Sequence, residues 1–346
     1  ENSTGSWRTL RSTYVHMFPP INHQCPAGED IQGWLFYAES GNYEKAWRHL
    51  TKRNPLPSCM GRVCYHTCEG ACNRGKLDAS VGINSVERFL GDNALENGYK
   101  FVKPEQKTGK KVLSVGSGPA GRSAAYQFAL KGHDVTIKEG SAEAGGMMRY
   151  GIPKYRLPRR VLDQEIARIL DLGVKLELNT TVKDIKEEQK AHGYDAVFLA
   201  VGAGMAKNAY NPGGDAKHML DAVSVLRSME GEAEPLLGRK VVVYGGGNTA
   251  IDVARSAKRM GAEPLIIYRR TREKMPAHDF EVEEALQEGV SVKWLSTITE
   301  AENPKEIRIE KMELDENGNP QPTGEFETVE ADAVVLALGQ NVDQRL

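Results

Sequence analysis

The chain has 346 residues, of which 40% are hydrophobic, and its formal net charge is −2. This length exceeds one average domain, and the balanced charge gives no indication of a nucleic-acid or membrane-surface partner. No apolar run is long enough to span a bilayer, and the N-terminus lacks the charged-then-apolar order of a secretory signal. We therefore expect roughly two or three packed domains in the cytoplasm.

Residues 1–27 contain Pro19, Pro20 and Pro26 and show little periodicity, so we expect an extended segment. Apolar spacing after that segment predicts short helices between residues 28 and 53 and a longer helix at about 80–97. The polar stretch that follows reads as a linker. The sequence therefore predicts a small helical domain over residues 28–105.

All five cysteines lie in this first part of the chain, at Cys25, Cys59, Cys64, Cys68 and Cys72. An odd, one-sided set in a sequence of cytosolic type argues against a disulfide framework and for a metal centre. The four-residue steps from Cys64 to Cys72 place three thiols on one side of a turn or helix. Buried structural thiols and zinc are alternatives, but the polar setting and the absence of a Cys-x2-Cys pair favour an iron–sulfur cluster.

A glycine-rich motif divides the chain at residues 116–121. An apolar strand precedes it, and a helix and a second strand ending in Glu139 follow, which is the βαβ pattern of a dinucleotide site. Gly116 permits the tight turn, Gly118 lets the backbone approach a pyrophosphate, and Gly121 lets helix and strand pack closely. Glu139 has the spacing that reaches a ribose hydroxyl.

Two further features follow the first dinucleotide motif. The pair Gly145-Gly146 would let the backbone pass close to a flat or phosphate-bearing ligand. Periodicity then predicts an amphipathic helix over 159–171, a strand over 174–178, and a buried strand over 194–202 that ends in glycine.

A second motif of the same order occurs at Gly245-Gly-Gly-Asn-Thr-Ala250. Its following strand ends in Arg269 and Arg270 rather than in an acid. Forked, permanently charged guanidinium groups suit the 2′-phosphate of NADP, and a solvated basic loop is the alternative. We expect Thr249 and Asp252 to cap and pack the helix rather than to catalyse.

Residues 331–339 repeat the apolar strand and terminal glycine of residues 194–202. This repeat predicts an α/β fold with two Rossmann-like nucleotide-binding domains, one inserted in the other, after the helical domain. The expected boundaries are 106–210 for the first part of one domain, 211–329 for the inserted domain and 330–346 for the return to the first.

Together these motifs resemble the NAD(P)H-dependent glutamate synthase small-subunit family of flavoproteins, over nearly the whole chain. The motifs that carry the resemblance are Cys25-Pro-Ala-Gly, Gly61-Arg-Val-Cys64, Cys68-Glu-Gly-Ala-Cys72, Val115-Gly-Ser-Gly-Pro-Ala-Gly121, Gly145-Gly-Met-Met-Arg-Tyr-Gly-Ile-Pro153, Gly245-Gly-Gly-Asn-Thr-Ala-Ile-Asp252 and Tyr268-Arg-Arg-Thr-Arg-Glu-Lys-Met-Pro-Ala277. The resemblance implies FAD at the first glycine motif, NAD(P)H at the second and [4Fe–4S] clusters in the helical domain.

The resemblance also implies the binding residues of each cofactor. For FAD they are Gly116, Gly118, Pro119, Ala120, Gly121, Glu139, Gly145, Gly146, Met147, Arg149 and Gly339. For NAD(P) they are Gly245, Gly247, Asn248, Thr249, Ala250, Arg269 and Arg270. For the metal centre they are Cys25, Cys64 and Cys68, with Cys72 or Glu87 as the open fourth choice.

The chain departs from the family pattern at residues 21–23, where Ile, Asn and His stand in place of cysteines of a further cluster. We therefore expect one [4Fe–4S] cluster, and Cys59 matches no family ligand. Arg122, directly after the third glycine, is a bulky charge where small or apolar residues usually pack.

The N-terminal stretch Asn2-Ser-Thr-Gly-Ser-Trp-Arg-Thr9 resembles the opening of the ferredoxin-like subunit of 2-oxoacid:acceptor oxidoreductases, such as pyruvate or phenylglyoxylate dehydrogenases. This resemblance implies docking on an iron–sulfur enzyme complex, with Trp7 and Arg8 as anchoring residues.

The expected function is that of an electron-transfer flavoprotein subunit in a hetero-oligomer, moving electrons between NAD(P)(H), FAD and the cluster and reducing NAD(P)+ for a 2-oxoacid oxidoreductase complex. The cofactors carry this chemistry, so we expect no catalytic side chain. The alternatives are the small subunit of an NADPH-dependent glutamate synthase and a non-catalytic assembly subunit. The expectation of an assembly subunit rests on the end of the sequence at Leu346, because the family pattern continues with a segment that closes over FAD.

Overall fold

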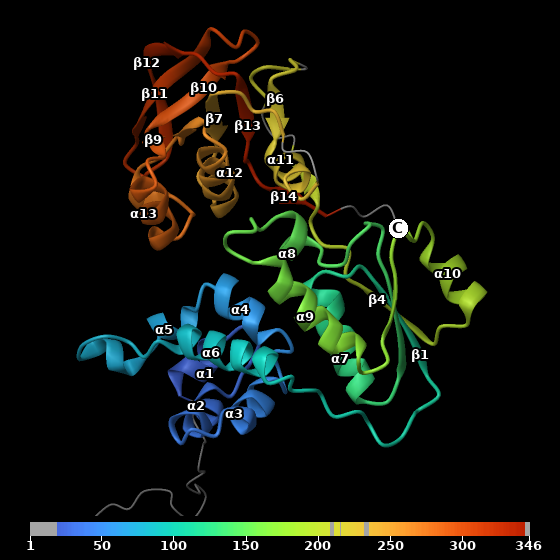
Figure 1. Ribbon diagram of the computed structural model, residues 1–346. Helices are drawn as coiled ribbons and strands as arrows, with labels where there is room; N and C mark the ends of the chain where they lie inside the picture. Colours follow the sequence, from blue (N-terminus) through green and yellow to red (C-terminus); the bar gives the residue numbers. More distant parts are fainter. Residues whose placement is uncertain (1–18, 208–210, 215, 232–234, 343–346) are drawn as a thin grey trace, which may run out of the picture. The chain divides into compact units, whose positions relative to one another are not determined.

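The computed structural model describes residues 19–207, 211–214, 216–231 and 235–342. The chain divides into two compact units, and the division falls between Tyr99 and Lys100. Figure 1 shows helices in the first unit and both helices and sheets in the second. Because no helix in these ranges combines the length and the apolar character needed to cross a bilayer, none is a membrane-span candidate.

The first unit is helical, as the sequence predicts. Its helices are α1 (Pro20–Gln24), α2 (Ile31–Glu39), α3 (Tyr43–Leu50), α4 (Pro57–Val63), α5 (Thr67–Gly70), the 3-10 turn η1 (Asn73–Lys76) and α6 (Ile83–Glu96). Trp34 is fully buried and packs with Leu90 in the shared core. Helix α1 lies in the stretch expected to be extended, because proline fixes a helical φ when it occupies the first turn.

The second unit begins with a parallel sheet of order β3-β2-β1-β4, formed by β1 (Lys111–Val115), β2 (Asp134–Lys138), β3 (Lys175–Glu177) and β4 (Ala196–Leu199). Its helices are α7 (Pro119–Leu130), α8 (Met147–Tyr150), α9 (Arg159–Leu170) and α10 (Ile185–His192). The strand expected within 194–202 is present as β4, but the expectation that it is buried is wrong. Strand β4 lies at the sheet edge, where Leu199 is 52% exposed.

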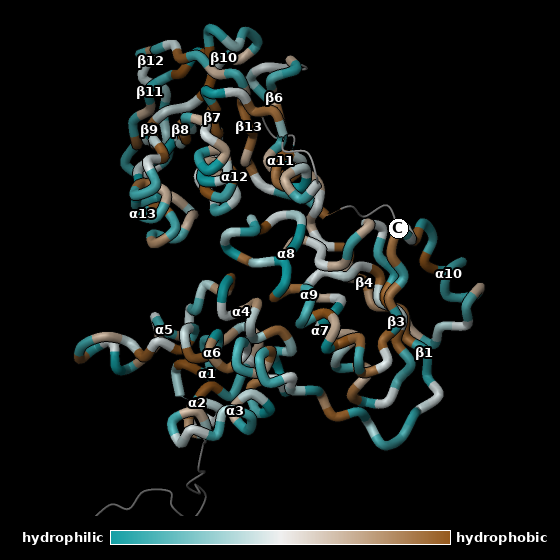
Figure 2. The backbone as a smooth tube through the Cα atoms, viewed as in Figure 1, coloured by the Kyte–Doolittle hydropathy of each residue, from teal (hydrophilic) through white to brown (hydrophobic). Residues whose placement is uncertain are grey.

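A second parallel sheet has the order β6-β13-β7-β8-β9, with β6 (Met219–Asp221), β7 (Lys240–Tyr244), β8 (Glu263–Ile267), β9 (Ser291–Lys293) and β13 (Ala333–Leu336). Alternate residues of its strands face two cores: Val243 packs on the helical side, and Val242 packs toward the antiparallel strands. Figure 2 shows the hydrophobic colour concentrated along strands such as β7 and β13. The elements on the two sides are α11 (Ala222–Ser228), α12 (Asn248–Arg259), η2 (Arg272–Lys274), α13 (Asp279–Gln287), β10 (Ser296–Glu300), β11 (Ile307–Leu314) and β12 (Pro320–Val329).

The boundary expected at residue 330 is wrong for β13. This strand pairs in parallel with β7 and β6, so it belongs to the second sheet. The repeat between 194–202 and 331–339 therefore reflects equivalent places in two sheets, with β4 beside β1 and β13 beside β7. The return to the earlier segment consists of β14 (Gln340–Asn341), which pairs with β5 (Met205–Ala206).

Candidate functional site

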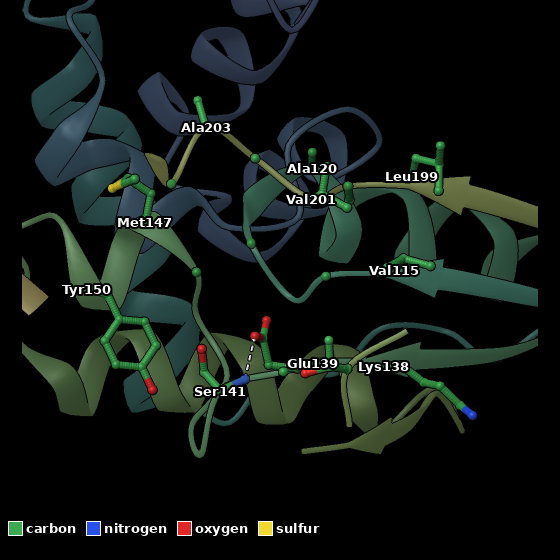
Figure 3. Close-up of a pocket in the computed structure, with 18 of the residues that line it drawn as sticks. Val115, Ala120, Lys138, Glu139, Ser141, Met147, Tyr150, Leu199, Val201 and Ala203 are labelled. Carbon is green, nitrogen blue, oxygen red and sulfur yellow. Dashed lines mark hydrogen bonds between the residues drawn. The ribbon is translucent and has the colours of Figure 1, made fainter. Parts of the chain in front are cut away.

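The first glycine motif opens into a cavity of about 600 Å³. Strand β1 ends at Val115, and α7 begins at Pro119, so the intervening turn lies at the carboxyl edge of the sheet, where ligands of such folds bind. Figure 3 shows Val115, Ala120, Glu139 and Met147 around the cavity. The expected FAD residues in its wall are Gly116, Gly118, Pro119, Ala120, Glu139, Gly146 and Met147.

The glycines of this motif are required for different reasons. Gly116 has φ +104°, and an added Cβ would lie 2.3 Å from the carbonyl oxygen of Ala200. A Cβ at Gly121 would lie 2.0 Å from the carbonyl oxygen of Gly116. Gly118 is different, since its nearest protein atom would be Gly146 Cα at 3.9 Å and its backbone is extended. The protein itself does not need glycine at 118, so the space fits a ligand that approaches the backbone, as a pyrophosphate does.

Glu139 is held in place by donors from two loops. Ser117 donates its backbone N–H and its hydroxyl to Oε2 at 2.9 and 2.7 Å, and Ser141 donates its N–H to Oε1 at 2.9 Å. Burial alone would raise the pKa of Glu139, but these hydrogen bonds outweigh it and lower the pKa. The carboxylate is therefore ionised and oriented, with lone pairs left for ribose hydroxyls.

Four expected FAD residues do not line this cavity: Gly121, Gly145, Arg149 and Gly339. Arg149 is buried and forms ion pairs with Glu143, Asp163 and Glu230. Gly121 packs helix α7 against its strand, and Gly339 lies in the wall of the second cavity. The charge at Arg122 is accommodated behind the wall, where its Nη2 donates to the Gly145 carbonyl at 3.2 Å.

Several lining residues had no signal in the glycine motif. They come from β2 and the loop after it, from the loops around residues 180 and 200, and from α11: Lys138, Ser141, Thr180, Thr181, Val182, Val201, Gly202, Val223 and Arg227. The order of the elements along the chain predicts that the ligand binds at the carboxyl edge of the sheet. It does not predict which distant loops lie beside that edge. Their identification requires the tertiary structure.

The second glycine motif opens into a cavity of about 710 Å³. Its expected NAD(P) residues in the wall are Gly245, Gly247, Thr249, Arg269 and Arg270. Asn248 instead accepts the His278 backbone N–H at 3.0 Å, and Ala250 is fully buried in the helix contact. Tyr244, Tyr268 and Thr297 also line the wall but were not among the expected binding residues, because the glycine motif includes none of them.

The geometry of the second loop repeats that of the first. Gly245 has φ +146°, and an added Cβ would lie 2.4 Å from the carbonyl oxygen of Ala337. Gly247 would meet no atom within 4 Å, so it too leaves room that the protein does not use. This cavity therefore fits a second dinucleotide.

The two arginines give the second cavity its charge. Within the described ranges, neither Arg269 nor Arg270 forms an ion pair with a carboxylate. The Nε–H of Arg270 is buried and has no acceptor there. An unpaired buried donor costs free energy, and an anionic ligand oxygen would supply the acceptor.

Behind this loop, Nη1 of Arg156 donates to both carboxylate oxygens of Asp252, at 2.9 and 2.7 Å, and its Nη2 donates to Glu281 at 2.5 Å. Burial and the neighbouring Asp252 raise the pKa of Glu281 to about 7, although Arg156 and Arg255 act to lower it. Asp252 is thus a packing residue of α12, in agreement with the expectation from sequence.

The cysteines of the helical unit fall into two groups. Helices α1 and α5 are in contact, and Thr67 Oγ1 donates to the Gln24 carbonyl at 3.2 Å, which brings Cys25 to the core around Cys68. Burial, together with the charges of Cys64 and Cys25, raises the pKa of Cys68 to about 12. These three thiols therefore lie close enough to influence one another. The described residues contain no group of three His, Cys, Asp or Glu side chains that could hold a single metal ion.

Backbone N–H groups point at these sulfurs. His66 has φ +39°, and its N–H donates to Cys64 Sγ at 3.3 Å. Backbone hydrogen bonds from Glu29 and Ala27 to Cys25 and from Glu69 to Cys68 act in the same direction, lowering each pKa against burial. N–H donors stabilise thiolates, so the three side chains fit a cluster whose irons take one thiolate each.

The two candidates for the fourth ligand, Glu87 and Cys72, have different surroundings. Glu87 is buried in α6 and its charge acts on Cys25 and Cys64. The pKa of the Cys72 thiol is lowered by hydrogen bonds from the backbone of Val81, Arg74 and Gly75, and the charge of Glu69 acts in the opposite direction. This difference favours Glu87 over Cys72 as the fourth ligand, and the assignment stays a prediction.

Comparison with known proteins agrees with both units. Residues 110–346 match the family described as pyridine nucleotide-disulphide oxidoreductase, and residues 16–99 match dihydropyrimidine dehydrogenase domain II, 4Fe-4S cluster. Among solved structures, 2-naphthoyl-CoA reductase superposes with a TM-score of 0.57 at 28% identity, over 78% of this chain and 39% of that one. Mycobacterium tuberculosis FprA in complex with NADPH superposes with a TM-score of 0.58 at 19% identity, over 67% of this chain and 71% of that one, which shows the fold alone.

Two curated relatives are similar to this chain over most of its length. The NADP(+)-dependent formate dehydrogenase subunit beta of Moorella thermoacetica is 39% identical over 94% of this chain, but the chain spans only 51% of that protein. The glutamate synthase [NADPH] small chain of Escherichia coli K12 is 32% identical over 93% of this chain and 74% of that protein. The chain therefore belongs to the pyridine nucleotide-disulphide oxidoreductases, in the family of the glutamate synthase small chain, and binds FAD, NAD(P)H and a [4Fe–4S] cluster.

Proposed function

We propose that this protein is the electron-transfer subunit of a larger oxidoreductase, moving electrons between NADP(H) and partner iron–sulfur subunits. When bound, FAD supplies the exchange between two-electron nicotinamide chemistry and one-electron cluster chemistry. The residues position the groups: Glu139 orients the FAD ribose, Gly118 and Gly247 admit the two pyrophosphates, and Cys25, Cys64, Cys68 and Glu87 hold the cluster.

The observation that carries this proposal is the charge contrast between the two cavities. One presents an ionised, fully oriented carboxylate at Glu139, and the other presents Arg269 and Arg270 without carboxylate partners among the described residues. A carboxylate accepts from an unmodified ribose, whereas guanidinium groups bind a 2′-phosphate. The FAD and NADP(H) sites are assigned on this basis. Relatives support the same nicotinamide: one from Moorella thermoacetica is an NADP(+)-dependent formate dehydrogenase subunit, and one from Geobacter sulfurreducens is an NADPH-Fe(3+) oxidoreductase subunit.

A spectrum of the anaerobically purified chain tests the assignment. We expect flavin absorption, about four irons per chain and bleaching by NADPH faster than by NADH. Cys68→Ser should remove the iron and leave the flavin. A preparation without flavin, or one not bleached by either nicotinamide, would contradict the enzyme and support an assembly role.

For the partner, we propose a 2-oxoacid:acceptor oxidoreductase, with electrons passing to NADP+. The support is the N-terminal stretch 2–9, which lies outside the described residues. A glutamate synthase large subunit, to which electrons would flow from NADPH, is the second candidate, because the small chain of that enzyme is a relative. Reconstitution with each partner separates them: NADP+ reduction must depend on a 2-oxoacid and on residues 2–9. Glutamine-dependent NADPH oxidation with the large subunit would overturn the first choice.

A further inference from the structure

Arg227 is a cation in the wall of the first cavity that comes from helix α11, outside the first sheet. Its Nη2 donates to Ser141 Oγ at 2.8 Å, and its guanidinium lies 4.5 Å from the centre of the Tyr150 ring. Ser141 is also the residue whose N–H holds Glu139. Figure 3 shows Tyr150, Ser141 and Glu139 along this side of the cavity. The guanidinium is therefore positioned beside the expected ribose site.

The charge of Arg227 is not neutralised by the described residues, which give it no carboxylate partner. The neighbouring cations differ. Lys138, in the same wall, pairs with Glu177 and Glu188, and the buried Arg149 has three acidic partners. A dinucleotide brings a doubly charged diphosphate into this cavity, and a planar guanidinium with unused N–H groups suits phosphate oxygens.

We propose that Arg227 is a FAD-binding residue that pairs with the diphosphate of the ADP half, so that helix α11 of the nucleotide-binding second sheet helps to retain the flavin. The inference rests on the proposed assignment of this cavity to FAD. Tyr150 and Ser141 hold the guanidinium in place before the ligand arrives, which reduces the entropy lost on binding. The glycine motif does not reveal this residue, because α11 lies about a hundred positions further along the chain.

The test measures dissociation constants of FAD, ADP and adenosine on the full chain after its flavin has been removed. Arg227→Gln should weaken FAD and ADP by about tenfold or more, the loss expected for one hydrogen bond to a charged group, and should leave adenosine unchanged. Arg227→Lys should recover part of the affinity, since it keeps the charge but not the fork. Arg239→Gln is the matched control, because that exposed arginine pairs with Glu263 outside the cavity wall.

The outcomes separate the two levels of the proposal. If the wild-type chain fails to bind FAD, the proposed function falls and this inference falls with it. If the wild type binds FAD and Arg227→Gln binds it within twofold, the inference alone is overturned. An equal loss of adenosine affinity would overturn the diphosphate contact. Thermal unfolding of the flavin-free variants should match the wild type, because the Arg227 side chain is exposed.

Discussion

The two glycine loops have nearly the same backbone and opposite chemistry. Gly116 and Gly245 both have positive φ, and both abut the carbonyl oxygen of the residue that directly follows a neighbouring strand, Ala200 after β4 and Ala337 after β13. The strand ends differ, with a hydrogen-bonded carboxylate at Glu139 in one and an arginine with a buried, acceptor-free Nε–H at 270 in the other. The loop backbone thus fixes where a dinucleotide lies, and the strand-end residues determine which dinucleotide it is.

The largest expected effect comes from the middle glycines. Gly118→Ala should weaken FAD binding by more than about a hundredfold, since a methyl group there removes several backbone hydrogen bonds to phosphate. Gly247→Ala should do the same to NADPH and leave FAD in place. Flavin content and NADPH titration measure both, and unfolding midpoints should barely change because both positions are open and extended. Loss of both cofactors in either variant would show that the loops are not independent.

The helices that follow the two loops should differ in how pH affects the stability of the fold. At equivalent positions, α12 has the carboxylic acid Asp252 and α7 has Ser123. Burial raises the pKa of the neighbouring Glu281 from 4.5 to about 7, so the folded protein binds that proton more tightly than the unfolded chain does. Its contribution to stability is complete below pH 4.5 and is lost as the pH rises through about 7.

Glu281→Gln should therefore gain stability relative to the wild type between pH 5 and pH 8, by up to about 3 kcal/mol. Denaturant unfolding at several pH values measures the difference. The groups around Glu281 are Arg156, Asp252, Arg255 and Glu284. Glu283→Gln is the control from the same helix, because Glu283 pairs with Arg272 and is not among these groups. A difference that does not vary with pH would show that Glu281 is already ionised throughout this range.

Substitution of the strand-end arginines of the second cavity should have a smaller effect than substitution of the middle glycines. Arg270→Ala should lower kcat/KM for NADPH by about tenfold and leave the value for NADH nearly unchanged, because only NADPH carries the 2′-phosphate. Arg269→Ala should act in the same direction. Steady-state rates with both nicotinamides check this, with Arg272→Ala as control, since that arginine pairs with Glu283. Equal losses for the two nicotinamides would assign the arginines to the shared part of the ligand.

Local sequence was sufficient for the loops and insufficient for what surrounds them. The periodicity before Gly116 and Gly245 and the helices after them depend on neighbouring residues, so they could be predicted. The pairing of β13 with β7 could not, because 194–202 and 331–339 have the same pattern and only long-range packing selects the sheet. For the same reason Arg227 and Tyr150 were not expected in the cavity wall.

The smallest effect concerns the third position of each motif. A Cβ at Gly121 would overlap the carbonyl oxygen of Gly116, whereas Ala250 is accommodated with no exposed surface. Ala250→Gly should therefore not improve the second loop, and it should cost about 1 kcal/mol through helix propensity and the lost methyl contact. Denaturant unfolding measures this loss against Ala254→Gly, an equally buried position of the same helix. A gain in stability at 250 alone would mean that both loops demand glycine and that alanine there is strained. An equal loss at 250 and 254 would confirm that the helix lies far enough from the second loop to admit a methyl group.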